Sequence, residues 1–253
     1  MSKWFSLIGI VAIAILGWFY SNAKATSATQ WQNLSPGIDY ANLNLNPGTL
    51  HAFKIDLKKN RLALISPQEP QTAKDMALSS QALIVTNAGF FTPEGTPLGL
   101  RINDGKVLSS SKPISWWGIF YLENNTPFIR SLNQFKLTES IDFAVQAGPR
   151  LLIARNIPHL KEGIDNRTAV GYNAENKVIL VVTENAQLTT ADLAAILGKP
   201  EKHGGLGCLY ALNLDGGSSS QVYAQIGKFN LDVPNYRPVA DGVAILPKYT
   251  HSS

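Results

Sequence analysis

Cysteine, charged residues and clustered metal ligands are all scarce in this sequence of 253 residues. The single cysteine, Cys208, excludes an intrachain disulfide framework and any zinc site built on several cysteines. Charged residues make up 16% of the chain, below the roughly 25% of an average domain, and hydrophobic residues make up 45%. Neither disorder nor a coiled coil fits that composition, so stability must come from a packed core.

The lack of a large basic patch and of a histidine metal-binding motif excludes two classes of function. The net charge is +4, and the only tight cationic run is Lys58-Lys59-Asn60-Arg61, so no nucleic-acid partner is expected. The four histidines show no His-x-x-x-His spacing, so we expect no catalytic zinc and assign no cofactor, while a site of oxygen ligands alone stays open. Cys208 lies in an apolar stretch with no histidine nearby in sequence, which predicts a buried, inert thiol.

The first 25 residues have the three parts of a secretory signal peptide. Lys3 precedes an apolar run from Trp4 to Tyr20, and Ala23 and Ala25 offer the small side chains that a signal peptidase accepts. The alternative is an uncleaved anchor, because 17 apolar residues are near the short limit for crossing a membrane. Both interpretations predict an extracytoplasmic protein, in the periplasm, secreted, or tethered at the outer face. Membrane contact is expected only through this segment, if it is uncleaved.

After the signal peptide, the sequence predicts a chain of short strands. Residues 26–49 are polar and rich in Asn, Ser, Pro and Gly, and are expected to be a linker or irregular leading segment. Residues 51–57 and 61–65 are expected to pair as a hairpin. Further hairpins are predicted around Asn103-Asp104-Gly105, around residues 123–126 and around residues 174–176. Single strands are expected at 82–86, 141–146, 151–153, 208–214, 221–225 and 242–246.

Two helices are predicted between these strands. Thr72 is a plausible N-cap for a helix over 72–82, and Thr189 or Thr190 for one over 191–197, which Gly198 and Pro200 would end. The pattern predicts an α+β protein: a single domain with a large, mainly antiparallel β-sheet and two or three packed helices. Its expected limits are residues 50–247, followed by a tail at 248–253.

Three segments place polar side chains where strands begin or end. Asn87-Ala88-Gly89-Phe90-Phe91 offers an amide and a ring for a sugar, Arg167 opens a strand and suits phosphate, and Asp215-Gly216-Gly217-Ser218 offers a carboxylate beside a sharp turn. Taken alone, each has a plain structural alternative: a Phe pair packed in the core, a surface ion pair, and an ordinary Asp-Gly turn. The Walker loop and the Gly-x-Ser-x-Gly elbow are absent.

The order of these segments resembles the phosphodiester glycosidase family, which includes the mannose-6-phosphate uncovering enzyme and bacterial envelope proteins. The matching segments are Asn87-Ala88-Gly89-Phe90-Phe91, Gln146-Ala147-Gly148-Pro149, Arg167-Thr168-Ala169-Val170-Gly171, Leu212-Asn213-Leu214-Asp215-Gly216-Gly217-Ser218-Ser219, Arg237 and Asp241-Gly242-Val243-Ala244-Ile245. The resemblance covers roughly residues 50–247. It departs from the family at Ala88, Gln146-Ala147 and Glu184, which affects loop shape and leaves the Asn, Arg and Asp positions intact.

The resemblance implies an exported hydrolase that cleaves a sugar-1-phosphodiester at the anomeric carbon, giving a free sugar and a phosphomonoester. Phosphate leaves easily, so one carboxylate with arginine would suffice where ordinary glycosidases need two carboxylates. Under this hypothesis Asp215 activates water or stabilises the oxocarbenium centre, Arg167 holds phosphate, and Glu184 is a spare acid. The expected substrate-binding residues are Asn87, Phe90, Thr168, Gly216, Gly217, Ser218 and Arg237.

Two other functions remain open at this point. A non-catalytic module that binds envelope glycans would use the same pocket but would not need Asp215. A structural envelope protein would instead be tethered by an intact N-terminal helix. In both enzyme and module the expected partner is a small-molecule or cell-wall sugar phosphodiester or glycan.

Overall fold

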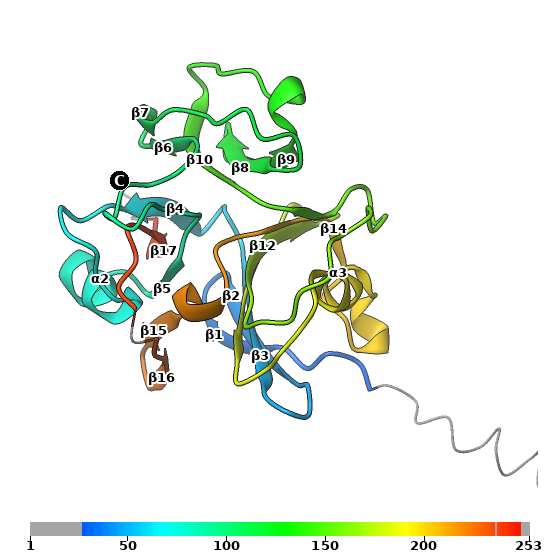
Figure 1. Ribbon diagram of the computed structural model, residues 1–253. Helices are drawn as coiled ribbons and strands as arrows, with labels where there is room; N and C mark the ends of the chain where they lie inside the picture. Colours follow the sequence, from blue (N-terminus) through cyan, green and yellow to red (C-terminus); the bar gives the residue numbers. More distant parts are fainter. Residues whose placement is uncertain (1–26, 236, 249–253) are drawn as a thin grey trace, which may run out of the picture.

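The computed structural model describes residues 27–235 and 237–248, and these fold into three antiparallel sheets, two α-helices and three short 3-10 helices (Figure 1). The predicted α+β class and single domain are confirmed. The predicted signal peptide lies outside the described residues. No helix within the described ranges is both long and apolar enough to cross a membrane.

Seven strands form the main sheet. In spatial order they are β1 (Gln32–Ser35), β2 (Ile38–Asn44), β3 (Thr49–Ile55), β13 (Val178–Glu184), β12 (Thr168–Asn173), β14 (Cys208–Asn213) and β11 (Arg150–Leu152). The second sheet has five strands, in the order β16 (Phe229–Val233), β15 (Val222–Ile226), β5 (Ile84–Asn87), β17 (Gly242–Pro247) and β4 (Asn60–Ile65). The third sheet has the order β7 (Lys106–Ser109), β6 (Arg101–Asn103), β10 (Ile141–Ala147), β8 (Gly118–Glu123) and β9 (Thr126–Arg130).

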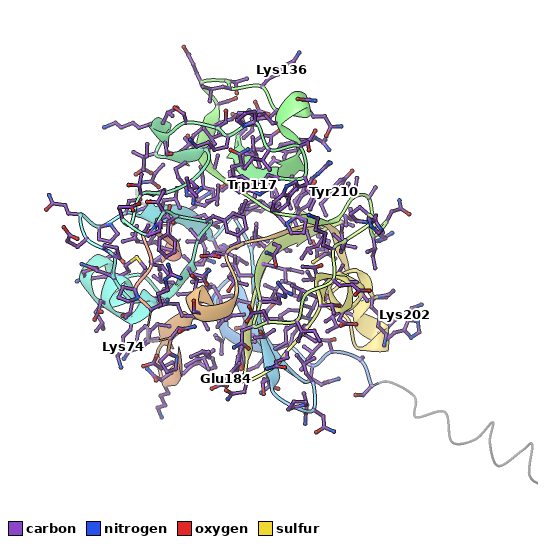
Figure 2. All side chains as sticks on the ribbon, viewed as in Figure 1. Lys74, Trp117, Lys136, Glu184, Lys202 and Tyr210 are labelled. Atoms are coloured by element: carbon purple, nitrogen blue, oxygen red, sulfur yellow. The ribbon has the colours of Figure 1, made fainter. Side chains whose placement is uncertain are left out.

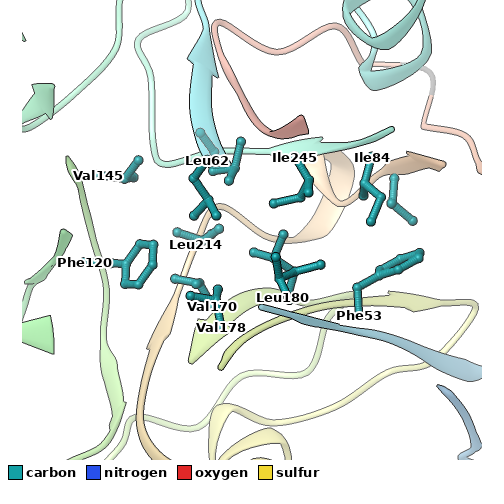
Figure 3. Close-up of a cluster of buried hydrophobic side chains, with 14 of the residues drawn as sticks. Phe53, Leu62, Ile84, Phe120, Val145, Val170, Val178, Leu180, Leu214 and Ile245 are labelled. Atoms are coloured by element: carbon teal, nitrogen blue, oxygen red, sulfur yellow. The ribbon is translucent and has the colours of Figure 1, made fainter. Parts of the chain in front are cut away.

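The main and second sheets face each other across the largest hydrophobic core. Phe53, Val170 and Leu180 from the main sheet meet Ile84 and Ile245 from the second sheet in this cluster (Figure 3). The third sheet closes one end of the core with side chains from β8, β9 and β10, and it lies above the other two sheets in Figure 1. Burial on both faces explains why β13 is apolar without alternation from Val178 to Val182.

The two α-helices cover the outer faces of these sheets. Helix α2 (Ala73–Ser80) packs on the second sheet through Met76, and its N-cap Thr72 accepts a hydrogen bond from the backbone N–H of Asp75. Helix α3 (Thr190–Gly198) packs on the main sheet through Leu193 and Leu197, and Thr189 caps it. Both helices were predicted from their caps. The molecule is thus a four-layer arrangement of helix, sheet, sheet and helix.

The large, mainly antiparallel sheet that the sequence predicts is the seven-stranded main sheet, and two five-stranded sheets accompany it, because turn residues show where the chain reverses but not which sheet a strand joins. Two sequence-based expectations about strand placement are wrong. Residues 26–49 are not an irregular linker, since they contain β1 and β2 and begin β3. The predicted hairpin of residues 51–57 with 61–65 does not form, because β3 pairs with β2 and β13 while β4 pairs with β17.

Strand β2 could not be recognised from the sequence because the segment that contains it is rich in polar residues. Ile38 and Tyr40 face the core and are buried, while Asp39 between them and Asn42 further along the strand are more exposed. Strand β1 pairs with β2 at one edge of the main sheet, where exposed polar side chains are tolerated. The other predicted hairpins are confirmed as β6 with β7, β8 with β9, and β12 with β13.

Candidate active site

A cavity of about 510 Å³ opens where several sheet-connecting loops meet. This volume lies in the range of small-molecule sites. The walls come from the segment after β5, the residues before β8 and β11, the connection from β11 to β12, the start of α3 and the end of β14. The lining residues are Phe90, Trp116, Gly148, Pro149, His159, Leu160, Lys161, Glu162, Gly163, Asp165, Arg167, Thr190, Asn213, Asp215, Gly216 and Gly217.

Asp215 enters the cavity directly after β14. The backbone N–H of Gly216 donates to its Oδ1 at 3.0 Å, and its own backbone N–H donates to the carbonyl of Ala88 at 3.1 Å. Burial raises the pKa of Asp215 above its ordinary value, while hydrogen bonds from Ser219 and Gly216 and the charges of two arginines oppose that shift. The carboxyl is therefore partly desolvated and still tied to the protein.

Arg167 lines the same cavity from the residue before β12. Its Nε donates to the carbonyl of Leu188 at 2.9 Å, and its Nη2 donates to the carbonyl of Gly163. Among the described residues, Nη1 has no hydrogen-bond partner, and it lies 3.9 Å from where a Cβ on Gly216 would stand. Burial lowers the pKa of Arg167 and the charge of Asp165 opposes this, yet a guanidinium stays protonated at neutral pH. One end of Arg167 is thus fixed, and the other is left for an anion.

Asn87 occupies a different place from the one the sequence predicts. It is buried, at 1% exposure, and is not among the lining residues. Its Oδ1 accepts from the Thr168 hydroxyl at 2.8 Å and from the Gln221 backbone N–H, while its Nδ2 donates to the carbonyl of Asp215 at 2.7 Å. These bonds use the amide's acceptor and donor groups within the protein. Asn87 and the fully buried Thr168 therefore hold the Asp215 backbone rather than face the cavity.

The glycines after Asp215 line the cavity as the sequence predicts, but their amides are used within the protein. The Gly217 N–H donates to the carbonyl of Asn166 at 2.8 Å. Gly217 has a φ of +60°, and a Cβ there would lie 2.7 Å from Oδ2 of Asp165, so only glycine fits without displacement. Ser218 is exposed and is not among the lining residues.

Phe90 lines the cavity, with its ring centroid 5.0 Å from that of Trp117. Arg237 does not line it: its guanidinium lies 5.2 Å from the ring centroid of Phe91, although its charge acts on Asp215. Cys208 is buried, as the sequence predicts, and burial raises the pKa of its thiol, which disfavours the reactive thiolate.

The structure does not bring Glu184 to the cavity. Its Oε2 lies 3.2 Å from Nε2 of His51, whose Nδ1 lies 2.8 Å from the Tyr40 hydroxyl. Figure 2 shows Glu184 near the bottom of the view, well below Trp117, which packs against cavity-lining Phe90. Glu184 is the last residue of β13 and points to the face opposite to the one that carries Thr183, and a strand end alone does not tell on which face a side chain falls.

Sequence reasoning missed four of the residues that matter at the cavity. Asp165 is a second carboxylate, two positions before Arg167, and Lys161 is a second cation. Trp116 adds an aromatic wall. Asn213 donates through Nδ2 to the carbonyls of Gly148 and Leu214, and its Oδ1 has no partner among the described atoms. Asn213 lies in the motif of residues 212–219 and could have been singled out there, whereas the other three lie on connecting segments with no periodic pattern.

A buried ion pair lies behind the cavity wall. Arg101 donates through Nε to Asp241 at 2.5 Å, and it also donates to backbone carbonyls that include those of Phe90 and Gln146. Both side chains are 1% exposed. No group of three or more His, Cys, Asp or Glu side chains within residues 27–235 and 237–248 is placed to hold a metal ion.

The layered antiparallel sheets define an α+β protein, and one cavity in it is lined by both Asp215 and Arg167. The family model of phosphodiester glycosidases matches residues 80–246, and the chain belongs to the phosphodiester glycosidase family. The resemblance that the sequence motifs indicated is thereby confirmed.

Relatives of this chain are distant. It is 28% identical over 151 residues to the uncharacterized protein YigE of Escherichia coli K12, a match that covers 55% of this chain and 52% of YigE. The chain therefore spans about half the length of this curated relative. The structure is similar to the zebrafish N-acetylglucosamine-1-phosphodiester alpha-N-acetylglucosaminidase catalytic domain, auto-inhibited by its pro-peptide. That match has a TM-score of 0.63 and 17% identity, and covers 87% of this chain and 86% of that one.

A second solved structure is a Burkholderia pseudomallei K96243 protein that is inferred to be exported. Its TM-score is 0.56 at 15% identity, and the match covers 79% of this chain and 74% of that one. At these identities, both structural matches show a shared fold and nothing finer.

Proposed function

We propose that this protein is an exported hydrolase that cleaves a sugar-1-phosphodiester at the anomeric carbon. The observation that carries the proposal is that the Asp215 carboxyl and the Arg167 guanidinium line one cavity. The family supports the same chemistry, since its members are phosphodiester glycosidases. A related protein, the zebrafish enzyme, acts on an N-acetylglucosamine-1-phosphodiester.

In the proposed reaction, the bond between the anomeric carbon and the phosphate oxygen breaks and its electron pair leaves with the phosphate. Water adds to the anomeric carbon, and Asp215 accepts the proton that this water loses. The products are a free sugar and a phosphomonoester. Arg167 binds the phosphate through Nη1 and stabilises the negative charge that the leaving group gains. Lys161, also at the cavity, adds positive charge.

We assign to Asp165 the role of spare acid that the sequence analysis assigned to Glu184. It is the second aspartate at the cavity, and Glu184 lies outside it. An alcohol leaving group needs an acid, but phosphate leaves as an anion, so the reaction does not depend on Asp165 delivering a proton. Under the proposal Asp165 is the acid available to the site, and Asp215 is the essential group.

Asn213 supports a sugar as the ligand. Two carbonyls accept from its Nδ2 and fix the orientation of the amide, which leaves Oδ1 as a buried acceptor without a donor. An unpaired buried acceptor costs about 1–3 kcal/mol. Asn213 lines the cavity, so under the proposal a sugar hydroxyl seated against it would supply the missing donor, whereas an ionised phosphate oxygen would not.

The proposed location is outside the cytoplasm. Its support is the signal-like sequence of residues 1–25 and the fold shared with a protein inferred to be exported. Mass spectrometry of the mature N-terminus tests this, because a start at Thr26 would show cleavage, and an intact Met1 would show an anchor.

The reaction is tested by incubating the purified chain with an N-acetylglucosamine-1-phosphodiester in water labelled with oxygen-18. Attack at the anomeric carbon places the label in the sugar, whereas phosphodiesterase chemistry places it in the phosphate. Asp215→Asn is expected to lower kcat by about 10²–10⁴. The exposed Asp142→Asn is the matched control and should keep full activity. If an unlabelled sugar is released, or if no sugar is released by a folded protein, the proposal is wrong.

A glycan-binding module without catalysis is the competing function. It predicts that wild-type protein and Asp215→Asn bind the phosphodiester equally and that neither turns it over. Binding by Asp215→Asn combined with turnover by wild type supports the enzyme.

A further inference from the structure

Much of the cavity lining is apolar. Trp116 lines the cavity together with Phe90, Pro149 and Leu160, and these side chains offer almost no hydrogen-bonding groups. The Trp116 ring stands edge-on to the buried Trp117 ring, with centroids 5.8 Å apart and an interplanar angle of 90°. Trp116 remains 53% exposed despite that contact. This part of the lining is therefore backed by the core and still open to a ligand.

Two exposed aliphatic side chains belong to the loop that lines the cavity. The connection from β11 to β12 supplies the lining run from His159 to Gly163, and Ile157 and Ile164 on either side of that run are 46% and 64% exposed. Seven large hydrophobic side chains are exposed on the described surface, and three of them, including Trp116, belong to segments that form this cavity. Apolar side chains gathered at the edge of a pocket indicate a ligand with an apolar part.

A sugar phosphodiester has three parts, and the cavity provides for the first two at polar groups. The sugar belongs near Asp215 and Asn213, and the phosphate near Arg167. The third part, the substituent on the phosphate, must leave past the remaining wall. A glycan or peptide substituent would need hydrogen-bond partners there. An aromatic ring such as that of Trp116 can stack on a sugar, but the aliphatic side chains of Ile157 and Ile164 cannot, so they favour an apolar substituent over a glycan.

We propose that the substituent beyond the phosphate is a hydrocarbon chain, so that the substrate is a lipid-linked sugar phosphate. This inference rests on the proposed function. The chain would lie along Trp116, Phe90 and Leu160 and leave the cavity between Trp116 and the loop that carries Ile157 and Ile164. The reaction would then release a free sugar and an alkyl or prenyl phosphate.

The test is a series of N-acetylglucosamine-1-phosphodiesters with methyl, butyl, octyl and dodecyl substituents, used below their micellar concentrations. Full burial of a methylene is worth about fourfold in binding, so kcat/KM should rise by about two- to fourfold per methylene over the shorter chains and then level off. The gain should appear as a lower KM with little change in kcat, because the chain lies away from the anomeric carbon.

Trp116→Ser and Ile164→Ser should both flatten this dependence on chain length, and Ile164→Ser, whose side chain does not line the cavity, should leave the methyl substrate within about twofold of wild type. The matched control is Leu137→Ser, which removes a side chain that is 59% exposed but not at the cavity, and it should keep the full dependence. Thermal unfolding of each variant establishes that the fold is retained.

Two outcomes would overturn the inference without touching the proposed function. One is equal kcat/KM for methyl and octyl substrates. The other is a glycosyl phosphodiester with a higher kcat/KM than every alkyl substrate, which would indicate that Trp116 stacks on a sugar. If no diester is cleaved, calorimetric binding of octyl and methyl phosphodiesters to the same protein decides separately. Failure of turnover then counts against the proposed function, and equal affinity counts against the hydrocarbon chain.

Discussion

At the residue scale, the environment of Asp215 links activity to stability. Because burial raises its pKa in the folded state, folding is favoured when the carboxyl is protonated, and this contribution is lost as the pH rises from the ordinary aspartate pKa through the raised one. The ionised form that accepts a proton from water is therefore the less stable form of the folded protein. Such a trade-off is common at catalytic sites.

Asp215→Asn should consequently stabilise the protein at neutral pH, by about 0.5–2 kcal/mol. The gain should shrink as the pH falls through the raised pKa and vanish below the ordinary aspartate pKa of about 3.9. Urea unfolding at a series of pH values measures this difference. A gain that is the same at every pH would show that the ionised carboxyl is not the cause.

Asn87 provides a second residue-scale prediction, since burial changes the role that the sequence assigns to it. A side chain that binds substrate affects KM when removed, but one that only holds Asp215 affects kcat. Asn87→Ala removes the bonds to Thr168, Gln221 and the Asp215 backbone. We expect kcat to fall by about 10–100-fold, KM to change by less than about threefold, and stability to fall by about 1–3 kcal/mol.

Steady-state kinetics with the methyl phosphodiester measure the two constants separately. Thr168→Val is the matched control, because it removes one donor to Asn87 and leaves the amide in place, so a smaller loss of kcat in the same direction is expected. A raised KM with unchanged kcat in Asn87→Ala would contradict the positioning role and would indicate that Asn87 contacts the substrate directly.

At the scale of elements, the Arg101–Asp241 ion pair joins the third sheet to the second sheet. Arg101 begins β6, Asp241 precedes β17, and Arg101 also holds the carbonyl of Phe90 on the cavity wall. Asp241→Ala leaves a buried guanidinium without its counter-charge and should destabilise the protein by about 3–5 kcal/mol. Exposed Asp142→Ala should cost less than about 0.5 kcal/mol. Denaturant unfolding compares the two, and a cost below 1 kcal/mol for Asp241→Ala would mean that water reaches the pair.

Elements whose causes are local could be predicted from the sequence, and elements that depend on distant partners could not. Thr72 and Thr189 mark helix starts because the cap and the helix lie within four residues of each other. Asp104-Gly105 likewise predicts the β6–β7 hairpin. The partner of β4, in contrast, is β17 near the other end of the chain, and no turn residue encodes that pairing.

At the scale of the whole molecule, the parts of the candidate site that are continuous in sequence could be predicted, and the parts assembled from distant segments could not. The motifs around Arg167 and Asp215 could be found because each is continuous in sequence. The cavity between them is built by several loops, so the sequence did not reveal Asp165 or Trp116 as its neighbours. It also assigned Asn87 to the substrate, since a motif does not show whether its amide is already paired.

The domain boundary gives the last prediction. The sequence placed the domain at residues 50–247, but β1 and β2 extend the main sheet and bury Ile38 and Tyr40 in the principal core. The preceding residues are also attached, because the Thr29 hydroxyl donates to the carbonyl of Gly205 and Trp31 Nε1 donates to Glu201. Removing all of these exposes the β3 edge and its unpaired backbone groups.

A chain that starts at residue 50 should therefore fail to unfold cooperatively and should aggregate, whereas a chain that starts at residue 27 should fold. Loss of two core side chains such as Ile38 and Tyr40 costs about 2–5 kcal/mol each, which approaches the whole stability of an ordinary domain. Size-exclusion chromatography and thermal melts of both chains test this. If the two melt within a few degrees of each other, β1 and β2 are an accessory to the domain, and the boundary that the sequence predicted is correct.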